Sequence, residues 1–282
     1  MALEKRVNYL QIALNSTPKE AREIIQYVPQ SERILIEAGT PLIKNYGIGV
    51  VSQIKDWYFE KFYPKYYQEK SKKSPLAKSP FFNIVDLILS ETKKEILKSQ
   101  TMKNLASSLL KEKSIQSKST EIKEPYIVAD LKCADLAERE VFMAKNAGAS
   151  SATCLGNASI ATIDKFIDSC QEMGIDSMID MMNAENPILV LKQLKKLPNV
   201  IILHRGVDET EKNKEKQIPY YQIKQIKGFS NKILVSVAGG DKMEEIRHAV
   251  FNDVDIVILW ENFYHPSPEI SNLANFFLNE IK

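Results

Sequence analysis

Residues 151–181 are SATCLGNASIATIDKFIDSCQEMGIDSMIDM, and this stretch decides the fold class. The apolar run at 151–155 predicts a buried strand. Apolar residues at helical spacing predict a helix over 160–173, which Gly174 ends. A second strand is predicted at 177–181. A strand, a helix and another strand in this order form a βαβ unit, whose two strands lie parallel in one sheet.

The same alternation of strands and helices extends over most of the chain of 282 residues. Strands are predicted at 9–14, 33–37, 126–130, 151–155, 177–181, 200–203, 232–237 and 255–259, with helical patterns between them. Thr17, Pro18 and Glu20 have the spacing of a capping box with proline at the first helical position. Eight such units predict a (β/α)8 barrel, and an open doubly wound sheet is the alternative.

Residues 58–122 interrupt this alternation between the second helix and the third strand. Helical patterns at 81–89 and 91–110 predict a largely helical insertion within a single barrel that spans residues 1–282. The insertion holds 13 Lys against 7 Asp and Glu, so it is more basic than the rest of the chain. Its first part alternates aromatic residues with lysines, which favours an amphipathic packing face over a nucleic-acid site.

The bulk composition argues against several classes of protein. A formal net charge of +2 provides no general attraction to nucleic acid or membranes. Cys133, Cys154 and Cys170 lack the spacing of a zinc site or a disulfide framework. No segment approaches the roughly 20 apolar residues of a membrane span, and the charged first residues are unlike a signal peptide. We therefore expect a cytoplasmic protein without a membrane or nucleic-acid partner.

Polar residues or glycines follow several predicted strands, where a barrel of this kind carries its active site. They are Glu37 after the second strand, Asp130, Lys132 and Asp135 after the third, His204 and Arg205 after the sixth, and Gly239 and Gly240 after the seventh. Asp180 ends the fifth strand and either enters the cavity or caps a turn. The sequence therefore predicts that carboxylates, a lysine and a histidine converge at the barrel mouth.

These residue types fit one chemistry. Glu37 and Asp130 could share Mg2+, a cation that prefers oxygen ligands. The cation and Lys132 would stabilise negative charge on an enediolate oxygen. His204 could transfer a proton near neutral pH, and Asp135 could orient Lys132 or carry protons.

The other candidates concern substrate binding. Arg205 stands beside His204, and Gly239 and Gly240 expose backbone N–H groups at a predicted helix start, which suits a phosphate. A tight turn is the alternative role of the two glycines.

With these motifs the sequence resembles the family of 3-hexulose-6-phosphate synthase and 3-keto-L-gulonate-6-phosphate decarboxylase, within the orotidine 5′-phosphate decarboxylase superfamily. The resemblance covers residues 8–57 and 125–259. It rests on LQIAL at 10–14, EAGTPLI at 37–43, Asp130-x-Lys132-x-x-Asp135, His204-x-Gly206-Val207-Asp208 and Ala238-Gly239-Gly240. Thr40-Pro41-Leu42 and Val207 are more similar to the synthase, since the decarboxylase has arginine at the latter position.

The resemblance implies a homodimeric, Mg2+-dependent carbon–carbon lyase that acts on a sugar phosphate, as in the condensation of ribulose 5-phosphate with formaldehyde. Glu37 and Asp130 match the metal ligands, Lys132 the lysine that contacts the enediolate, and His204 the proton-handling histidine. Asp135 matches an aspartate that reaches the neighbouring active site across the dimer interface.

Two departures from the family leave the substrate open. Asn15 stands where the family has a substrate-binding aspartate, so hydrogen bonding is kept and the charge is lost. Trp260-Glu261 stands where the family completes its phosphate site with Gly-Gly or Gly-Arg, and both residues oppose a dianion. The alternatives are a family member with a changed substrate, either a decarboxylase or one with a non-phosphate ligand, and a non-catalytic binding or regulatory barrel that uses the basic insertion.

Overall fold

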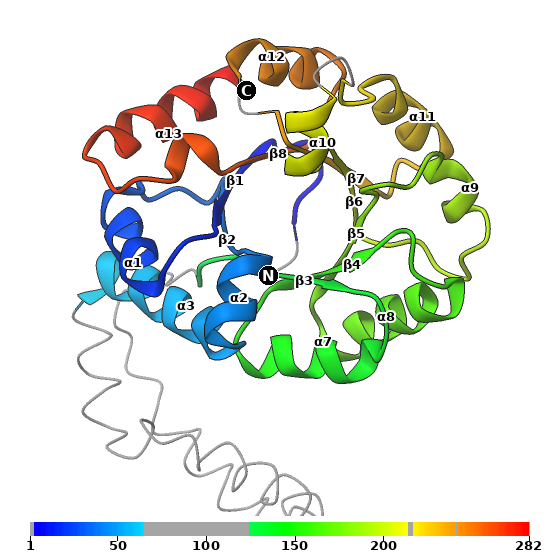
Figure 1. Cartoon of the computed structure of the whole chain (residues 1–282), viewed down its shortest axis with the longest axis horizontal. Coiled ribbons are helices and arrows are strands. Elements are labelled where there is room, and N and C mark those ends of the chain that lie inside the picture. Colours follow the sequence, from blue (N-terminus) through cyan, green and yellow to red (C-terminus); the bar gives the residue numbers. More distant parts are fainter. Residues whose placement is uncertain (1–2, 65–123, 214–216, 241, 282) are drawn as a thin grey trace, which may run out of the picture. The chain divides into compact units, whose positions relative to one another are not determined.

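Eight parallel strands form a closed barrel in sequence order, with helices around the outside (Figure 1). The computed structural model describes residues 3–64, 124–213, 217–240 and 242–281. The strands are β1 (Tyr9–Leu14), β2 (Ile34–Ala38), β3 (Ile127–Cys133), β4 (Ser151–Leu155), β5 (Asp176–Asp180), β6 (Val200–His204), β7 (Leu234–Ala238) and β8 (Ile256–Leu259). Pairing of β1 with both β2 and β8 closes the ring. The predicted (β/α)8 barrel is confirmed.

Helices follow the strands on the outside of the barrel. They are α1 (Pro18–Tyr27), α2 (Thr40–Tyr46), α3 (Gly49–Phe62), α7 (Ala137–Asn146), α8 (Ile160–Met173), α9 (Pro187–Leu191), α10 (Val207–Lys212), α11 (Tyr221–Phe229), α12 (Met243–Phe251) and α13 (Glu269–Glu280), with a 3-10 turn η1 (Glu261–Phe263). The capping box of α1 is present, since Thr17 and Glu20 each accept the other's backbone N–H at 3.2 Å. Such a cap contributes about 1 kcal/mol. None of the described helices is long and apolar enough to cross a membrane.

Two details differ from the predicted elements. The helix predicted around residues 46–59 corresponds to α3, whereas α2, which ends after Tyr46 because Gly47 has a φ of 78°, was not predicted. Residues 58–62 of the predicted insertion are the last residues of α3. The chain divides into two compact units, residues 1–62 with 124–282 and residues 63–123. The predicted helical character of the insertion falls on residues 65–123, which lie outside the described part.

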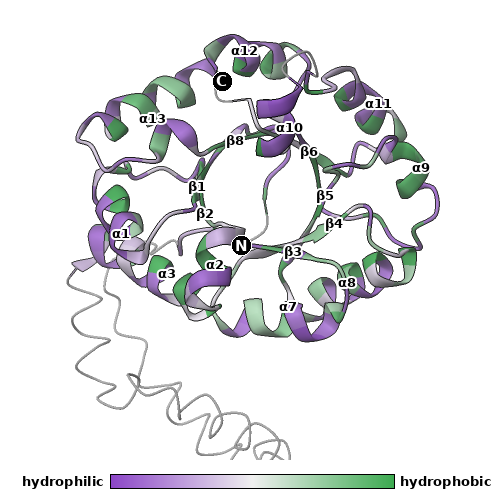
Figure 2. Ribbon diagram, in the orientation of Figure 1, coloured by the Kyte–Doolittle hydropathy of each residue, from purple (hydrophilic) through white to green (hydrophobic). Residues whose placement is uncertain are grey.

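Alternation along the strands divides the apolar side chains into two groups. On β1, Leu10, Ile12 and Leu14 pack against the surrounding helices, whose apolar and polar residues are shown in Figure 2. Tyr9 and Ala13 belong to the group inside the barrel. Because side chains alternate between the two faces of a strand, the last inward position of each strand lies at the carboxyl-end mouth. The strands therefore determine which side chains meet there.

Candidate functional site

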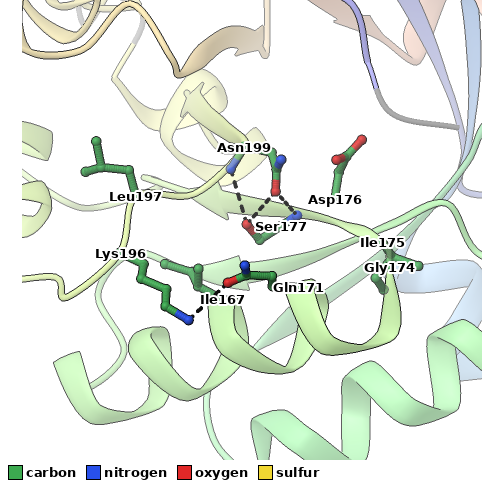
Figure 3. Close-up of a pocket in the computed structure, with 9 residues that line it drawn as sticks. All are labelled: Ile167, Gln171, Gly174, Ile175, Asp176, Ser177, Lys196, Leu197 and Asn199. Atoms are coloured by element: carbon green, nitrogen blue, oxygen red, sulfur yellow. Dashed lines mark hydrogen bonds between the residues drawn. The ribbon is translucent and has the colours of Figure 1, made fainter.

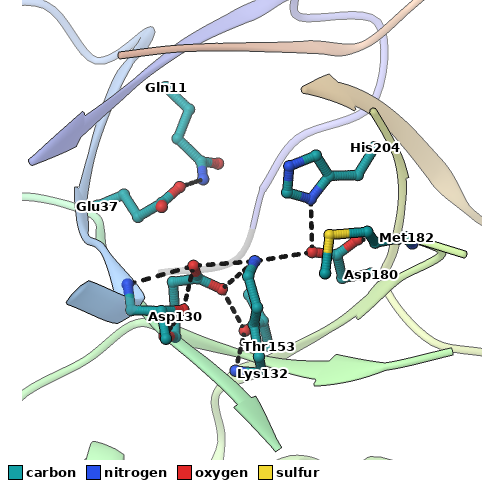
Figure 4. Close-up of polar contacts among 9 residues, drawn as sticks. Gln11, Glu37, Asp130, Lys132, Thr153, Asp180, Met182 and His204 are labelled. Carbon is teal, nitrogen blue, oxygen red and sulfur yellow. Dashed lines mark hydrogen bonds and ion pairs between the residues drawn. The ribbon is translucent and has the colours of Figure 1, made fainter. Parts of the chain in front are cut away.

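A cavity of about 530 Å³ opens at the carboxyl ends of the strands. Most strands contribute an inward side chain from their last residues. The cavity walls include Ala13, Glu37, Asp130, Lys132, Thr153, Asp180, Ile202, His204, Ala238 and Ile258. The apolar members come from β1, β6, β7 and β8, whereas the ionisable ones come from β2, β3, β5 and β6. The reactive groups therefore lie on one side of the mouth (Figure 4).

Two threonines on neighbouring elements hold the carboxylate of Asp130 in place. The hydroxyl of Thr40, the first residue of α2, donates to Oδ2 at 2.6 Å, and its backbone N–H donates to the same atom at 3.3 Å. The hydroxyl of Thr153 on β4 donates to Oδ1 at 2.7 Å. Neither threonine was predicted as a site residue. Their hydroxyls supply hydrogen-bond donors to a side chain that is only 7% exposed.

Lys132 bridges two carboxylates inside the mouth. Its Nζ lies 3.1 Å from Oδ2 of Asp130 and 2.9 Å from Oδ2 of Asp180. The β3–β4 register shifts between Ala129 and Cys133, and Lys132 has a φ of 47°, so a local irregularity of the strand places this side chain. Burial lowers the pKa of Lys132, but the charges of Asp130 and Asp180 outweigh it and hold the pKa above its usual value. The lysine is therefore a fixed cation.

Asp180 is the centre of the network, and sequence reasoning gave it only a minor place. Its carboxylate accepts from Lys132, lies 2.8 Å from Nδ1 of His204, and accepts the backbone N–H of Met182 at 2.9 Å. Burial would raise the pKa of Asp180, but the hydrogen bond from His204 and the charges of His204 and Lys132 lower it to about 2. Because the carboxylate is ionised, it accepts from Nδ1, so Nε2 of His204 is the ring nitrogen available to a ligand.

Glu37 has the opposite electrostatic environment. It is 7% exposed, and burial together with the charge of Asp130 raises its pKa to about 8, against the lowering effects of Lys132 and of a hydrogen bond from Gln11. The amide Nε2 of Gln11 donates to Oε2 of Glu37. A carboxyl group with this pKa is mostly protonated at neutral pH unless another positive charge lies beside it.

This donor set fits the predicted magnesium. Glu37 and Asp130 both supply carboxylate oxygens to the same cavity, and burial together with the neighbouring Asp130 makes a negative charge on Glu37 unfavourable unless a cation lies beside it. Magnesium commonly binds through one or two carboxylates and keeps waters or substrate oxygens in its other positions. No cluster of three His, Cys, Asp or Glu residues suited to a metal occurs in the described residues.

The structure brings three predicted substrate-binding residues to the cavity and leaves one behind its wall. Asn15, Arg205 and Gly239 line the cavity. Arg205 Nη2 donates to the carbonyl of Gly239 at 2.7 Å and to Oε1 of Glu245 at 2.8 Å. Gly239 has a φ of 85°, and a Cβ there would lie 2.2 Å from the Arg205 carbonyl oxygen, so glycine is required. Gly240 is buried outside the cavity lining, where a Cβ would meet Ile218.

Asp135 lies outside the mouth. It is exposed at the start of α7 and lines a surface pocket with Leu136 and Phe142, which are 64% and 40% exposed. The predicted role of orienting Lys132 is filled by Asp130 and Asp180 within this chain. Asp135 follows the end of the strand by two residues, which carries it past the barrel rim.

The far rim of the cavity carries charges of both signs. Trp260 and Glu261 follow β8 and line the cavity beside Lys242 and Glu245 of the β7 side. The indole of Trp260 packs edge-on against Tyr264 with ring centres 5.7 Å apart. The two residues that depart from the family pattern therefore face the cavity, and the acidic groups there offset the nearby cations.

A second pocket lies at the opposite end of the barrel, beside the starts of β5 and β6 (Figure 3). Its polar groups bind one another, since Oδ1 of Asn199 accepts the backbone N–H and the hydroxyl of Ser177 at 2.9 and 3.0 Å. The amino-terminal face of these barrels serves stability, whereas the carboxyl-terminal face carries the chemistry. The mouth is therefore the candidate active site.

The closed barrel of eight parallel strands, with a lysine held between two carboxylates at its mouth, places the chain in the class of (β/α)8-barrel proteins with a polar site at the carboxyl ends of the strands. No family model matches the chain. The chain is 30% identical over 278 residues to the bifunctional enzyme Fae/Hps of Methanocella arvoryzae, an alignment that covers 97% of this chain and 53% of that protein. The Fae/Hps enzyme of Methanosarcina barkeri is 28% identical over 97% of this chain and 52% of its own length. The chain thus spans about half the length of the curated relatives it matches.

Solved structures share the barrel. A 3-hexulose-6-phosphate synthase from Salmonella typhimurium aligns with a TM-score of 0.64 and 18% identity, over 97% of this chain and 100% of that one. A 3-keto-L-gulonate-6-phosphate decarboxylase from Vibrio cholerae aligns with a TM-score of 0.60 and 18% identity, over 98% of this chain and 97% of that one. The resemblance to the family of 3-hexulose-6-phosphate synthase and 3-keto-L-gulonate-6-phosphate decarboxylase, drawn from the motifs, is confirmed.

Proposed function

We propose that this barrel is a Mg2+-dependent carbon–carbon lyase that works on a sugar phosphate through an enediolate, with the reaction of 3-hexulose-6-phosphate synthase. The observation that carries the proposal is Lys132, held by Asp130 and Asp180 next to His204 and Glu37 in one cavity. The names of the relatives and of the aligned structures support the same reaction class.

In this proposal Glu37 and Asp130 hold the cation, which supplies positive charge where the enediolate oxygens develop negative charge. Lys132 places a second, permanent positive charge at the same spot. Nε2 of His204 removes a proton from the hydroxymethyl carbon of ribulose 5-phosphate, and the resulting enediolate attacks the carbon of formaldehyde. The new alkoxide then takes this proton back from Nε2 of His204, which gives the hydroxyl group of the hexulose phosphate and restores the base.

Asp180 acts through its neighbours. Its contacts of 2.9 Å to Lys132 and 2.8 Å to His204 fix both side chains, so that the ammonium group of Lys132 and the imidazole of His204 face the same substrate atoms. An ionised Asp180 also keeps the proton of His204 on Nδ1, which leaves Nε2 able to accept one.

A homodimer belongs to the same proposal. Leu136 and Phe142 line the same surface pocket as Asp135, and their apolar side chains, like that of Met143 on α7, are exposed, which favours a contact with another protein surface. The second copy of this chain is the partner that the resemblance implies.

The test is an assay of the purified chain with ribulose 5-phosphate, formaldehyde and Mg2+, with product formation followed by NMR. We expect turnover that is abolished by excess chelator, by Asp130→Ala and by Lys132→Ala, while Ser236→Ala, a buried change on β7 outside the cavity lining, retains it. Full activity in excess chelator would refute the metal role, and no turnover under any of these conditions would refute the reaction.

A second candidate is a family member with a changed substrate. Trp260 and Glu261 line the cavity and oppose a phosphate dianion, one by volume and one by charge. Turnover of a non-phosphorylated sugar, or loss of CO2 from a sugar acid, in the absence of turnover of ribulose 5-phosphate would select this candidate.

A further inference from the structure

Gln11 is a polar side chain deep inside the barrel that the mechanism above leaves without a role. It lies on β1 at 0% exposure, one inward position below Ala13, whose small side chain lines the cavity. In the β1–β2 register, Ala13 is opposite Glu37 and Gln11 is opposite Leu35. Gln11 therefore reaches the carboxylate of Glu37 from beneath the cavity floor.

The two ends of the Gln11 amide are satisfied unequally. Nε2 donates to Oε2 of Glu37, whereas Oε1 is buried and has no hydrogen-bond partner among the described residues. A buried acceptor without a donor costs about 1–3 kcal/mol. Figure 4 shows the amide oxygen turned away from Glu37, toward the part of the mouth where His204 lies.

Rotating the Gln11 amide by half a turn exchanges Oε1 and Nε2, but it does not give both atoms a hydrogen-bond partner. Oε1 would then face the carboxylate of Glu37, and two acceptors would meet wherever Glu37 is ionised. With Glu37 bound to a cation the carboxylate is ionised, so the observed orientation is the favourable one. The same orientation leaves Oε1 in need of a donor that the described residues do not supply.

We propose that Gln11 is a positioning residue of the magnesium site: its Nε2 fixes the ligand oxygens of Glu37, and its Oε1 accepts a hydrogen bond from a water in the shell of the cation. This inference rests on the proposed metal role of Glu37 and Asp130. Magnesium keeps several of its waters, and groups that hold metal ligands in place contribute strongly to affinity. A water bound there would also give Oε1 of Gln11 the donor that it lacks among the described residues.

The test measures metal binding rather than turnover. Mn2+ replaces Mg2+ as the probe, and free Mn2+ is measured by electron paramagnetic resonance during titration of the purified chain. Gln11→Met keeps the volume of the side chain and removes both polar ends. We expect it to weaken Mn2+ binding by about 10–100-fold. Ser236→Ala, which removes another buried oxygen without a partner among the described residues, should change the affinity by less than about twofold.

The outcomes separate this inference from the proposed function. Unchanged Mn2+ affinity in Gln11→Met, with the unaltered chain binding the ion, would overturn the role of Gln11 alone. No Mn2+ binding by the unaltered chain would overturn the metal site and with it the role of Gln11. If Gln11→Met does not fold, Gln11→Asn provides the same comparison, because its amide is one methylene too short to reach Glu37 and should lose affinity equally.

Discussion

Replacement of Asp180 by asparagine removes the charge at the centre of the mouth network while keeping its shape. The carboxylate lies 2.9 Å from Lys132 and 2.8 Å from His204 at 1% exposure. Lowering its pKa from 3.8 to about 2 corresponds to stabilisation of about 2 kcal/mol at neutral pH. Removing one partner of a buried ion pair costs roughly 3–5 kcal/mol, and Asp130 still faces Lys132 in the variant, so we expect a loss of about 2–4 kcal/mol.

For a barrel of this size, that loss corresponds to a decrease of roughly 5–10 °C in melting temperature, measured by circular dichroism at pH 7.5. Because the folded pKa of Asp180 is below the unfolded one, its contribution is complete above about pH 4 and is lost as pH falls through about 2. The stability difference between the unaltered chain and the variant in urea should therefore be constant from pH 5 to pH 7.5 and smaller at pH 3.

Asp176 provides a matched control on the same strand and the same inward face. Burial raises its pKa, although the hydrogen bond from Tyr126 opposes this, so ionisation of Asp176 is less favourable in the folded protein than in the unfolded chain. Asp176→Asn keeps an acceptor for Tyr126 and should leave the melting temperature unchanged or higher. The reasoning fails if Asp180→Asn melts within 1 °C of the unaltered chain, or if Asp176→Asn loses as much.

Three further predictions concern the metal, the substrate and the assembly. Burial and Asp130 raise the pKa of Glu37 to about 8 in the metal-free site, and the carboxyl group must lose its proton before it binds a cation. The affinity for Mn2+ should therefore fall about tenfold for each pH unit below 8. An affinity that is independent of pH between 6 and 8 would contradict this. The double replacement Trp260→Gly with Glu261→Gly should raise the affinity for ribulose 5-phosphate more than tenfold, which corresponds to about 1.4 kcal/mol and can be measured by calorimetry. Tight binding of ribulose 5-phosphate by the unaltered chain would refute this prediction. Light scattering should give a dimer mass, reduced to a monomer by Leu136→Asp; a monomeric unaltered chain that retains catalysis is the contrary result.

The elements of the fold were predictable because each depends on neighbouring residues. The capping box at Thr17 and Glu20 and the apolar run of β4 are local patterns, and both occur as predicted. Helix α2 was missed because its seven residues are too few to show a helical pattern, although Gly47, whose positive φ ends it, follows directly. The glycine was the available signal.

The partners of the site residues were less predictable than the residues themselves. Glu37, Asp130, Lys132 and His204 line one cavity, as a barrel with inward strand ends requires. The place of Asp180 depends on where β5 begins, since the strand starts at Asp176 and its inward positions are 176, 178 and 180. Arg205 directly follows β6 and Glu245 lies in the first turn of α12; these two residues are 40 positions apart, and no local pattern predicts their contact.

The half of the mouth around Asp180 and the half around Glu37 differ in their balance of charge. Asp180 has a pKa of about 2 because Lys132 and His204 outweigh its burial, so this half is balanced by the protein's own charges. Burial and Asp130 together outweigh Lys132 and raise the pKa of Glu37 to about 8, so in the other half the protein's own charges do not offset the burial of the carboxylate. Carboxylates in one cavity whose pKa values are pushed apart serve different roles. The proposed cation therefore belongs between Glu37 and Asp130, while Asp180 positions the lysine and the base.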